Sequence, residues 1–368
     1  MQRIALALQG LPHDRAILKS ARDSNGESAP RMYLFDDLFV RRYDESILQD
    51  VPPNLQSIYR TLPRWMQIAL EVHRRRDEYD AVVSWNERVT LALMAVQRFS
   101  SDPKPHIPMM YWFSRPSVRT PMRVFGSTLA SIITWSSVQR NYAVQKLGVP
   151  SGKIYLLKHF VDQLFWSPRE SPVEDLICAA GAEMRDYLTL IKAMRGTNVR
   201  CHIATDHVRI DRLGFGRRVA VDDFSQLASP NVTLGLLSRP DLRALYARSR
   251  FVVVPLRPSD TDNGITVILE AMAMGKPVIC TKTRGQVDVI QDGVTGIFVP
   301  AGDPVALRNA ILSLWHDPER VRAMGQAGRR YIEKHHTLDK FCYDVRNAIG
   351  TALSIRSACA DGSLSQVY

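Results

Sequence analysis

Short apolar runs alternate with helical patterns through the second half of the chain, and this alternation restricts the fold more than any other feature. Six apolar runs bounded by turn residues are typical of buried strands, at 175–181, 199–205, 231–236, 251–256, 277–281 and 296–299. Helical patterns lie between or after them, at 186–194, 240–249, 264–274, 303–316 and 318–334. Strands and helices that alternate at this spacing form a parallel sheet with helices on both faces. We therefore predict an α/β, doubly wound domain.

The first half shows the same alternation less clearly, with candidate strands at 3–8, 81–85, 107–112, 131–135 and 153–157. The polar stretch SPRESP, which begins at Ser167, predicts a boundary between two domains, 1–167 and 168–337. The residues after about 357 have little apolar content, so a disordered tail is expected over 358–368. Two doubly wound domains joined in this way would leave a cleft between them. The strand ends of both sheets would face a ligand bound in that cleft.

Charge is unevenly divided between the two halves of the chain, whose net charge is +11. Residues 1–160 hold 22 Lys and Arg against 14 Asp and Glu, whereas residues 161–368 hold 26 against 23. A basic first half indicates an anionic partner. Charge alone leaves nucleic acid, a phospholipid surface and a phosphorylated substrate open.

Three features predict a cytoplasmic location. No apolar run approaches the roughly 18 residues that a spanning helix needs. The start, MQRIALALQG, lacks the small-residue cleavage site of a secretion signal. The five cysteines form no C-x-x-C pair, which argues against a zinc site and a disulfide framework and fits a reducing compartment. No metal site is expected.

Residues 262–275 (DNGITVILEAMAMG) carry the clearest chemical signal. From Gly264 onward this segment is apolar nearly all round, as in a buried helix, and only Thr266 and Glu270 interrupt it. These two residues are four apart and so share one face. A carboxylate in a buried helix is costly unless something hydrogen-bonds it, and cations or sugar hydroxyls could do so.

The start of this helix has the features of an anion site. It follows the run FVVVPL through a turn that contains glycine, so the N–H groups of Gly264, Ile265 and Thr266 would point outward at the positive end of the helix dipole. Glu270 lies roughly 9 Å further along the axis, which is about the reach from a diphosphate to a ribose. One helix could hold both parts of a nucleotide. The alternative is a core helix in which Glu270 pairs with an arginine elsewhere.

This segment resembles the E-x(7)-E motif of retaining GT-B glycosyltransferases of family 4. The resemblance continues through EAMAMGKPVICT, TRGQVDVI, DGVTGIFVPAGDPVALRNAI and GRRYIEKHH, and upstream through AAGAEMRDYLTLIKAM and SVQRNYAVQKLGVPSGKIYLLKHFVD. It covers most of residues 130–350. It implies the GT-B fold: an acceptor-side domain over 1–167, a nucleotide-sugar donor domain over 168–337, and a C-terminal helix over 338–357 that returns to the first domain.

The resemblance also implies roles for the residues of this motif. The final glutamate binds ribose hydroxyls in the family, and this position is Glu270. The first acidic residue, which contacts the donor sugar, is Asp262 here rather than Glu. The amides of Gly264, Ile265 and Thr266 fall where the family cradles the donor sugar and phosphate.

Two further donor-side positions are marked by the family pattern. Members usually carry two cations, but Ala182 stands after Gly181 where the first is expected. Arg185 occupies the place of the second, where members carry lysine. An arginine there can still bind a phosphate, and it can do so with two N–H groups at once. Leu237 falls where backbone atoms hold the base. On the acceptor side the stretch MMYWFSRP lacks the histidine that members often carry, so no acceptor residue is carried over.

The resemblance implies a retaining, metal-independent transfer of a sugar from a nucleotide-diphospho-sugar to an acceptor hydroxyl, in cell-envelope or other glycan biosynthesis. The donor is a co-substrate, no cofactor is expected, and the acceptor is a glycan or a lipid-linked molecule rather than nucleic acid. The alternative is a non-catalytic paralogue that binds a sugar nucleotide or a partner chain. The D-x-D at Asp260–Asp262 would instead suggest a metal-dependent transferase, a weak signal because such matches arise by chance.

A helix expected over 61–76, with Thr61 as its cap, predicts a membrane-facing surface on the first domain. It carries Trp65, Met66, Ala69 and Leu70 beside Arg64 and the triplet at 74–76. A second basic cluster comprises Arg115, Arg119 and Arg123. These residues predict peripheral binding to the inner, anionic face of the membrane. The alternative is that the apolar residues cover the domain's own sheet and the arginines are solvated.

Overall fold

The computed structural model describes residues 2–9, 15–205, 207–209, 218–220 and 229–360. Its internal contacts divide the chain into two compact units. Unit one comprises residues 1–19, 32–158 and 339–368, and unit two comprises residues 20–31 and 159–338. Most of the expected tail over 358–368 lies outside the described residues.

The division differs from the expected boundary at 167 in two places. Unit two begins at His159, and it also includes the segment Ser20–Arg31 from the first half of the chain. Arg31 holds this segment through its backbone N–H and its guanidinium, which both donate to the buried Asp162 carboxylate at 2.7 and 2.8 Å. No pattern in a local stretch of sequence reports a contact between residues so far apart.

The sheet of unit one has six parallel strands in the order β2-β1-β3-β4-β5-β6. The strands are β1 (Ile4–Leu8), β2 (Arg41–Tyr43), β3 (Ala81–Trp85), β4 (His106–Met109), β5 (Ile132–Thr134) and β6 (Ile154–Leu156). All five strands expected from the apolar runs are present. The sequence did not predict β2, because an edge strand of three residues that begins with two arginines has no apolar run.

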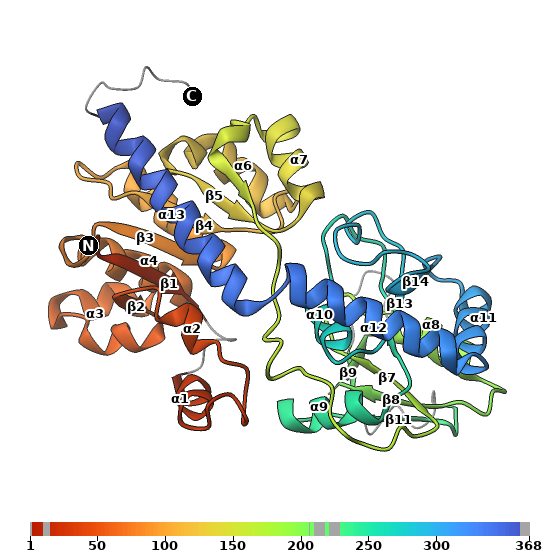
Figure 1. Cartoon of the computed structure of the whole chain (residues 1–368). Helices are drawn as coiled ribbons and strands as arrows, with labels where there is room; N and C mark the ends of the chain where they lie inside the picture. Colours follow the sequence, from red (N-terminus) through yellow and green to blue (C-terminus); the bar gives the residue numbers. More distant parts are fainter. Residues whose placement is uncertain (1, 10–14, 206, 210–217, 221–228, 361–368) are drawn as a thin grey trace. The chain divides into compact units, whose positions relative to one another are not determined.

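Helices surround this sheet, and the C-terminal helix belongs to the same unit (Figure 1). The helices are α2 (Tyr33–Asp36), α3 (Pro53–Arg60), α4 (Arg64–Arg74), α5 (Glu87–Arg98), α6 (Pro116–Phe125), α7 (Ser137–Leu147) and α13 (Leu338–Ala360), with 3-10 turns η1 (Glu45–Asp50), η2 (Arg76–Glu78), η3 (Gly126–Thr128) and η4 (Ser151–Lys153). Helix α1 (Arg15–Asp23) is divided between the two units after Lys19. In α13, the Phe341 ring stacks on Phe35 with their centroids 6.0 Å apart. This contact and other buried side chains of α13 hold the helix on unit one.

The helix expected over 61–76 begins only at Arg64, so the cap assigned to Thr61 is wrong. Thr61 instead ends α3, and its hydroxyl donates to the Ile58 carbonyl at 2.7 Å. Pro63 precedes α4 in an extended conformation, which a proline favours and which stops α3 from continuing.

The main sheet of unit two is also parallel, in the order β11-β8-β7-β12-β13-β14. Its strands are β7 (Leu176–Ala180), β8 (Arg200–Ala204), β11 (Val232–Gly235), β12 (Val252–Val254), β13 (Val278–Thr281) and β14 (Gly296–Val299), and a separate antiparallel pair is formed by β9 (His207–Arg209) and β10 (Arg218–Ala220). The chain runs outward in opposite directions from β7 and β12. The strand order therefore reverses between β7 and β12. Doubly wound sheets bind ligands at such a point, between the loops that follow the carboxyl ends of the two strands.

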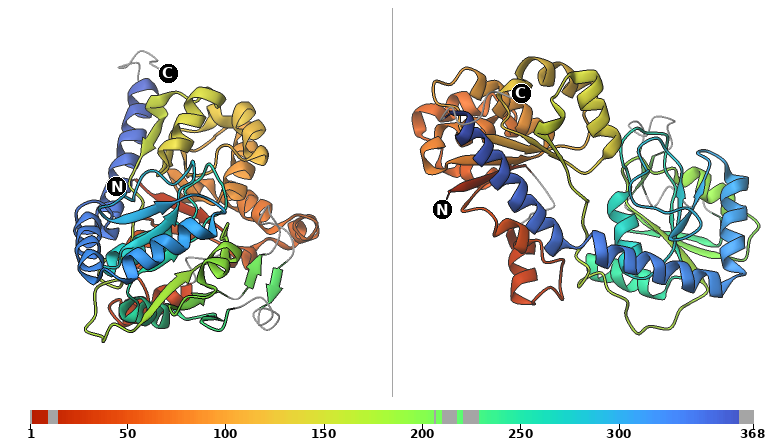
Figure 2. Two further views of the ribbon diagram at one scale, coloured as in Figure 1. Left: turned by 90° about the vertical axis from the view of Figure 1, so that its right-hand side faces the viewer. Right: turned by 45° about the horizontal axis from the view of Figure 1, so that its top comes forward.

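Helices cover both faces of this sheet, as the second half of the sequence predicts (Figure 2). They are α8 (Tyr187–Met194), α9 (Arg239–Arg248), α10 (Ile265–Ala273), α11 (Pro304–Trp315) and α12 (Pro318–His335). Helix α10 buries seven of its nine side chains, and only Thr266 and Glu270 stay partly or fully exposed. In the described part of the chain, none of the helices combines the length and hydropathy needed to cross a bilayer.

Candidate functional site

The loops after β7 and β12 are joined to each other at the carboxyl edge of the sheet in unit two. Arg185 and Leu256 form an antiparallel bridge. The Asp186 N–H donates to the Pro255 carbonyl at 2.9 Å, and the Arg257 N–H donates to the Met184 carbonyl at 2.9 Å. These bonds tie the loop that carries Arg185 to the loop that leads into α10.

The Arg185 side chain is buried beside the N-terminus of α10. Its Nε donates to the Ala180 carbonyl at 2.9 Å and its Nη1 to the Glu183 carbonyl at 2.8 Å. A Cβ atom added at Gly181 would lie 2.7 Å from Nη2 of Arg185, and one added at Gly264 would lie 3.4 Å from Nη1. The guanidinium therefore lies between the two glycines, next to the positive end of the helix dipole, where both favour an anion.

Gly264 allows the chain to turn into α10. Its φ is +87°, a left-handed conformation, and an added Cβ would lie 2.9 Å from Val254 Cγ1. The Ile265 N–H donates to the Asp262 carbonyl at 3.1 Å. This bond closes a tight turn at the helix start, and the role expected for the Ile265 amide in holding a phosphate stays a prediction. No described residue accepts from the amides of Gly264 and Thr266, as is usual for the first amides of a helix.

Asp262 is buried in the loop before α10, and its Oδ1 accepts from the Thr261 hydroxyl at 3.2 Å. Gln286, in the loop after β13, holds this loop from the other side. Its Nε2 donates to the carbonyls of Asp262 and Asn263 at 3.1 and 2.9 Å. The sequence analysis did not identify Gln286 as a positioning residue. Gln286 follows β13, which is the neighbour of β12 in the sheet. Its position in a loop at the same sheet edge is the signal that could have identified it.

Glu270 lies on α10, six residues after Gly264, and contacts α9. The Tyr246 hydroxyl donates to Glu270 Oε2 at 3.3 Å. Burial raises the pKa of the Glu270 carboxyl to about 7, although the charges of Arg239 and Arg185 and the bond from Tyr246 oppose this shift. The Tyr246 ring packs against Trp166, with their centroids 5.6 Å apart. The alternative pairing of Glu270 with an arginine is not found among the described ion pairs.

This raised pKa predicts that binding of a nucleotide-sugar strengthens as pH rises. Hydroxyl donors favour the ionised carboxylate, so affinity should increase about tenfold between pH 6 and pH 8 as Glu270 loses its proton. A nucleotide-sugar lacks the terminal phosphate whose pKa is about 6, so the change would come from the protein. Calorimetric titration across this range measures it, and Glu270→Gln should remove the pH dependence. An equally pH-dependent Glu270→Gln variant would contradict the assignment.

Leu237 lies in the loop between β11 and α9, at the same carboxyl edge but beyond β8. The leucine side chain has no hydrogen-bonding group, so the role predicted for Leu237 would rest on its backbone. Within the described residues, no three or more His, Cys, Asp or Glu side chains are grouped so that they could hold a metal ion.

In unit one, the two clusters expected to face a membrane are partly used in folding. Arg74 and Arg75 donate to the buried Glu71 carboxylate at 2.7 and 3.3 Å, and Ala69 is buried in the core of the unit. Arg119 donates to the Ser114 carbonyl at 2.7 Å. The burial of Ala69 agrees with the alternative that the apolar residues cover the domain's own sheet. Arg74, Arg75 and Arg119, however, are bonded within the unit rather than only solvated.

Comparison with known proteins finds similarity over part of unit two. Residues 177–317 match the family described as glycosyl transferases group 1. A D-inositol 3-phosphate glycosyltransferase from Segniliparus rotundus is 32% identical over 136 residues, which are 37% of this chain and 28% of that protein. A GDP-mannose-dependent alpha-(1-6)-phosphatidylinositol monomannoside mannosyltransferase from Mycolicibacterium smegmatis is 34% identical over 112 residues, 29% of this chain and 28% of that protein. The chain thus aligns with about a quarter of the length of these relatives.

Solved structures share the fold over nearly the whole chain. Sucrose-phosphate synthase from Thermosynechococcus elongatus has a TM-score of 0.71 at 14% identity, covering 96% of this chain and 100% of that one. Anabaena HepE, solved with UDP and glucose, has a TM-score of 0.68 at 14% identity, covering 96% of this chain and 100% of that one. The expected GT-B fold is confirmed.

Proposed function

We propose that this chain, whose second unit belongs to the glycosyl transferases group 1 family, transfers a sugar from a nucleotide-diphospho-sugar to an acceptor hydroxyl with retention of configuration. One observation supports this most strongly. The buried guanidinium of Arg185 lies beside the N-terminus of α10, and the same helix presents Glu270 four residues after the exposed Thr266. A diphosphate at the first position would bring its ribose toward the second.

Some residues of the site would then stabilise charge, and others would position the substrate. Arg185 and the amides of Gly264 and Thr266 would stabilise the negative charge on the departing diphosphate. Glu270 would accept hydrogen bonds from the ribose hydroxyls. Asp262, held by Gln286, would orient the sugar. The acceptor hydroxyl would attack from the face that the diphosphate leaves, and a phosphate oxygen would take its proton, so the protein needs no covalent intermediate.

The chemistry of the relatives suggests the acceptor. The two relatives are named as a D-inositol 3-phosphate glycosyltransferase and a phosphatidylinositol monomannoside mannosyltransferase. Escherichia coli O-antigen chain mannosyltransferase C is 32% identical over 127 residues, 34% of this chain and 34% of that protein. We propose a glycan or lipid-linked acceptor, used in cell-envelope or related glycan synthesis.

A donor panel tests the proposed function. The protein is incubated with UDP-, GDP- and ADP-sugars, and release of free nucleoside diphosphate is measured with and without a glycan extract. We expect nucleoside diphosphate to be released from sugar nucleotides of one base only, and the glycan extract to increase this release. Binding of a sugar nucleotide without release under any condition would show the non-catalytic alternative, and no binding to any member of the panel would contradict the proposed site.

Transfer is predicted to proceed without a divalent metal. Arg185 and the helix amides supply the positive charge that a metal would otherwise place on the diphosphate. Activity should be unchanged when EDTA is added to the assay. Loss of activity in EDTA, restored by magnesium or manganese, would instead support a metal role for Asp260 and Asp262.

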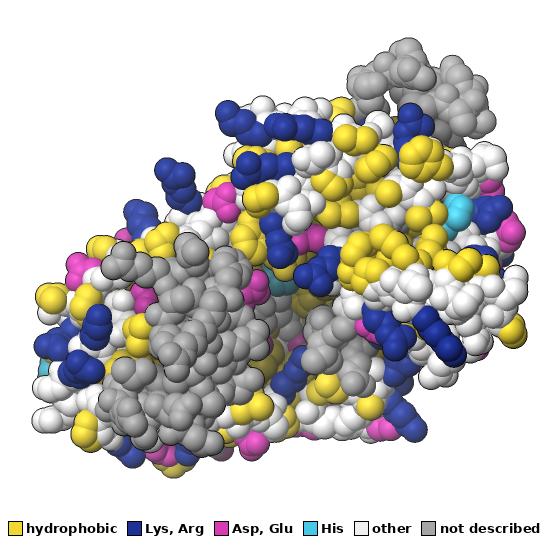
Figure 3. Space-filling model, turned by 180° about the vertical axis from the view of Figure 1, so that it is seen from behind, with side chains coloured by type: hydrophobic (Ala, Val, Ile, Leu, Met, Phe, Trp, Pro, Cys, Tyr) yellow, Lys and Arg dark blue, Asp and Glu magenta, His cyan; other side chains and the backbone are white. Residues whose placement is uncertain are grey.

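Unit one is predicted to bind an anionic membrane surface at the cytoplasmic side, through the turn between α3 and α4. Arg60 and Arg64 are exposed there beside Ile58, which is 56% exposed. On the face that Figure 3 shows, Lys and Arg side chains lie next to hydrophobic ones. Each basic residue near an anionic leaflet contributes about 1 kcal/mol, so binding should be weak and reversible.

Co-sedimentation with vesicles measures this. Binding should require anionic lipid, weaken with salt, and fall in the double variant Arg60→Ser, Arg64→Ser. Arg74→Ser is the matched control, because Arg74 already pairs with Glu71. Absence of pelleting with anionic vesicles at low salt would overturn the membrane prediction and favour a soluble acceptor.

A further inference from the structure

Unit two contains a hollow at the amino edge of its sheet, which the proposed transfer does not use. This amino-edge pocket has a volume of about 610 Å³. It is formed by α12, by the end of α10 at Met274, and by the segments that enter β7 and β12 at Val173 and Arg250. Strands of a parallel sheet all point the same way, so this edge is opposite to the one that holds Arg185.

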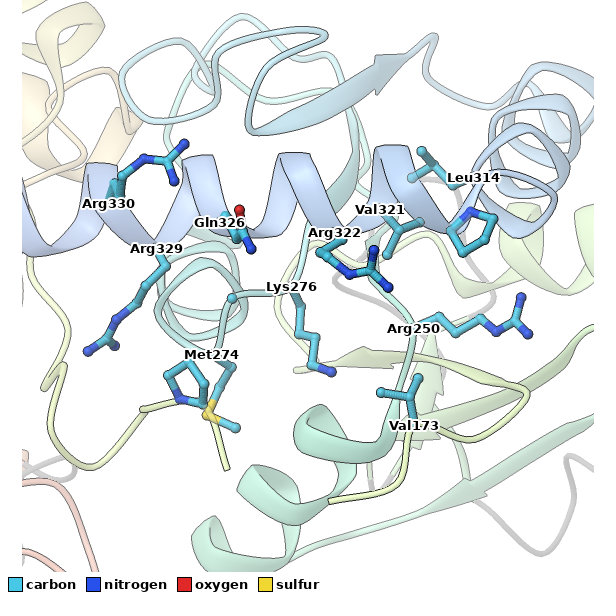
Figure 4. Close-up of a pocket in the computed structure, with 13 residues that line it drawn as sticks. Val173, Arg250, Met274, Lys276, Leu314, Val321, Arg322, Gln326, Arg329 and Arg330 are labelled. Atoms are coloured by element: carbon cyan, nitrogen blue, oxygen red, sulfur yellow. The ribbon is translucent and has the colours of Figure 1, made fainter. Parts of the chain in front are cut away.

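One face of α12 forms a wall of the pocket (Figure 4). Pro318, Arg322 and Gln326 are spaced four residues apart and so lie near one another along the helix. The helix can approach α10 closely because Gly325 has no side chain: a Cβ added there would lie 2.0 Å from the Gly275 carbonyl oxygen. This close crossing brings α12 against Gly275, which also lines the pocket.

Five basic side chains line the amino-edge pocket, and no acidic side chain does so within the described part of the chain. Two of the five are already neutralised: Arg250 pairs with Asp175, and Arg329 pairs with Glu333. The other three, Lys276, Arg322 and Arg330, form no ion pair with any described carboxylate. The pocket therefore carries uncompensated positive charge.

In Figure 4 the side chains of Lys276 and Arg322 both lie below α12, on the side of the pocket, whereas that of Arg330 extends from the opposite side of the helix. The Lys276 Nζ donates to the Ala247 carbonyl at 2.7 Å, which leaves two of its three hydrogens for a ligand. Burial lowers the pKa of this ammonium, and an anion beside it would oppose that shift. The two cations thus define where an anionic group would bind.

The remaining walls are apolar, and their accessible surface comes from Pro168, Val173, Pro318 and Val321, with Met274 and Leu314 buried behind them. We propose that the amino-edge pocket binds an amphiphilic anion, in which a phosphate group contacts Lys276 and Arg322 and an apolar body lies against these side chains. Both parts are needed, because charge-assisted hydrogen bonds hold the phosphate and burial of apolar surface stabilises the rest. The inference does not depend on the proposed transfer, since the two sites lie at opposite edges of the sheet.

Calorimetric titration of the full chain with three probes tests the proposal: short-chain phosphatidic acid below its micelle concentration, short-chain phosphatidylcholine, and inorganic phosphate. Phosphatidic acid should bind about tenfold or more tightly than either of the others. Saturating UDP should leave this binding unchanged. Phosphate that binds as tightly as phosphatidic acid would overturn the role of the apolar walls, and equally tight phosphatidylcholine would overturn the role of the cations.

Matched variants locate the binding. Lys276→Met and Arg322→Gln should each weaken binding of phosphatidic acid about tenfold. Arg330→Gln removes the same charge from the same helix but should change binding less than twofold, because its side chain points away. Arg322 is exposed, so its variant tests the contact even where Lys276→Met fails to fold. Equal binding by the wild type and Arg322→Gln, or equal losses in Arg322→Gln and Arg330→Gln, would contradict the proposal.

Discussion

Arg185→Ala is expected to lower the kcat of sugar transfer by about 10²–10³-fold, the usual effect of removing one donor that stabilises transition-state charge. The guanidinium is preorganised, because Nε and Nη1 are held by the carbonyls of Ala180 and Glu183. It lies within reach of a group bound at the N-terminus of α10 without further movement. Steady-state kinetics with the donor found in the panel measures the loss.

Two controls separate this catalytic effect from damage to the fold. Arg308 also binds backbone carbonyls in unit two, at Ala193 and Arg195, but it lies on α11, away from the site. Arg308→Ala should therefore lower the melting temperature while kcat stays close to that of the wild type. Arg185→Lys, which keeps one charge but not the fork of donors, should recover part of the activity. A kcat in folded Arg185→Ala equal to that of the wild type would contradict the assignment.

Glu270→Ala is expected to weaken nucleotide-sugar binding about ten- to a hundredfold. Hydrogen bonds to a charged group contribute roughly 1.5–3 kcal/mol, which corresponds to that range of affinity. The residue lies on α10 next to Tyr246 and is partly shielded from water. A water molecule would therefore not replace the hydrogen bonds that the carboxylate is expected to accept from the ligand. Calorimetric titration with the donor measures the change.

Variants of its neighbours distinguish binding from turnover. Asp262→Ala should mainly lower kcat, because this carboxylate is expected to orient the sugar rather than to hold the nucleotide. Tyr246→Phe removes only the bond to Glu270 Oε2 and should have a smaller effect than Glu270→Ala. If Glu270→Ala bound the donor as tightly as the wild type, the ribose-binding role would be wrong.

Several parts of the fold follow from local patterns. The apolar runs of unit two are strands within one or two residues of the predicted bounds, because a strand buried on both faces must be apolar throughout. Asp303 followed by Pro304 predicts the start of α11, where the Asp303 carboxylate accepts from the amides of Val305 and Ala306. The exposed positions of α10, Thr266 and Glu270, also follow from sequence alone, since they are its only polar residues.

The sequence by itself thus determined the elements, the doubly wound class, and which helix carries the polar groups. Only the tertiary structure decided what those groups meet. It placed the Arg185 guanidinium between Gly181 and Gly264, joined Tyr246 to Glu270, and assigned the segment Ser20–Arg31 to unit two. The physical reason is that helix and strand periodicity depends on neighbours within a few residues. These contacts instead join residues that strand order and chain crossing bring together from distant parts of the sequence.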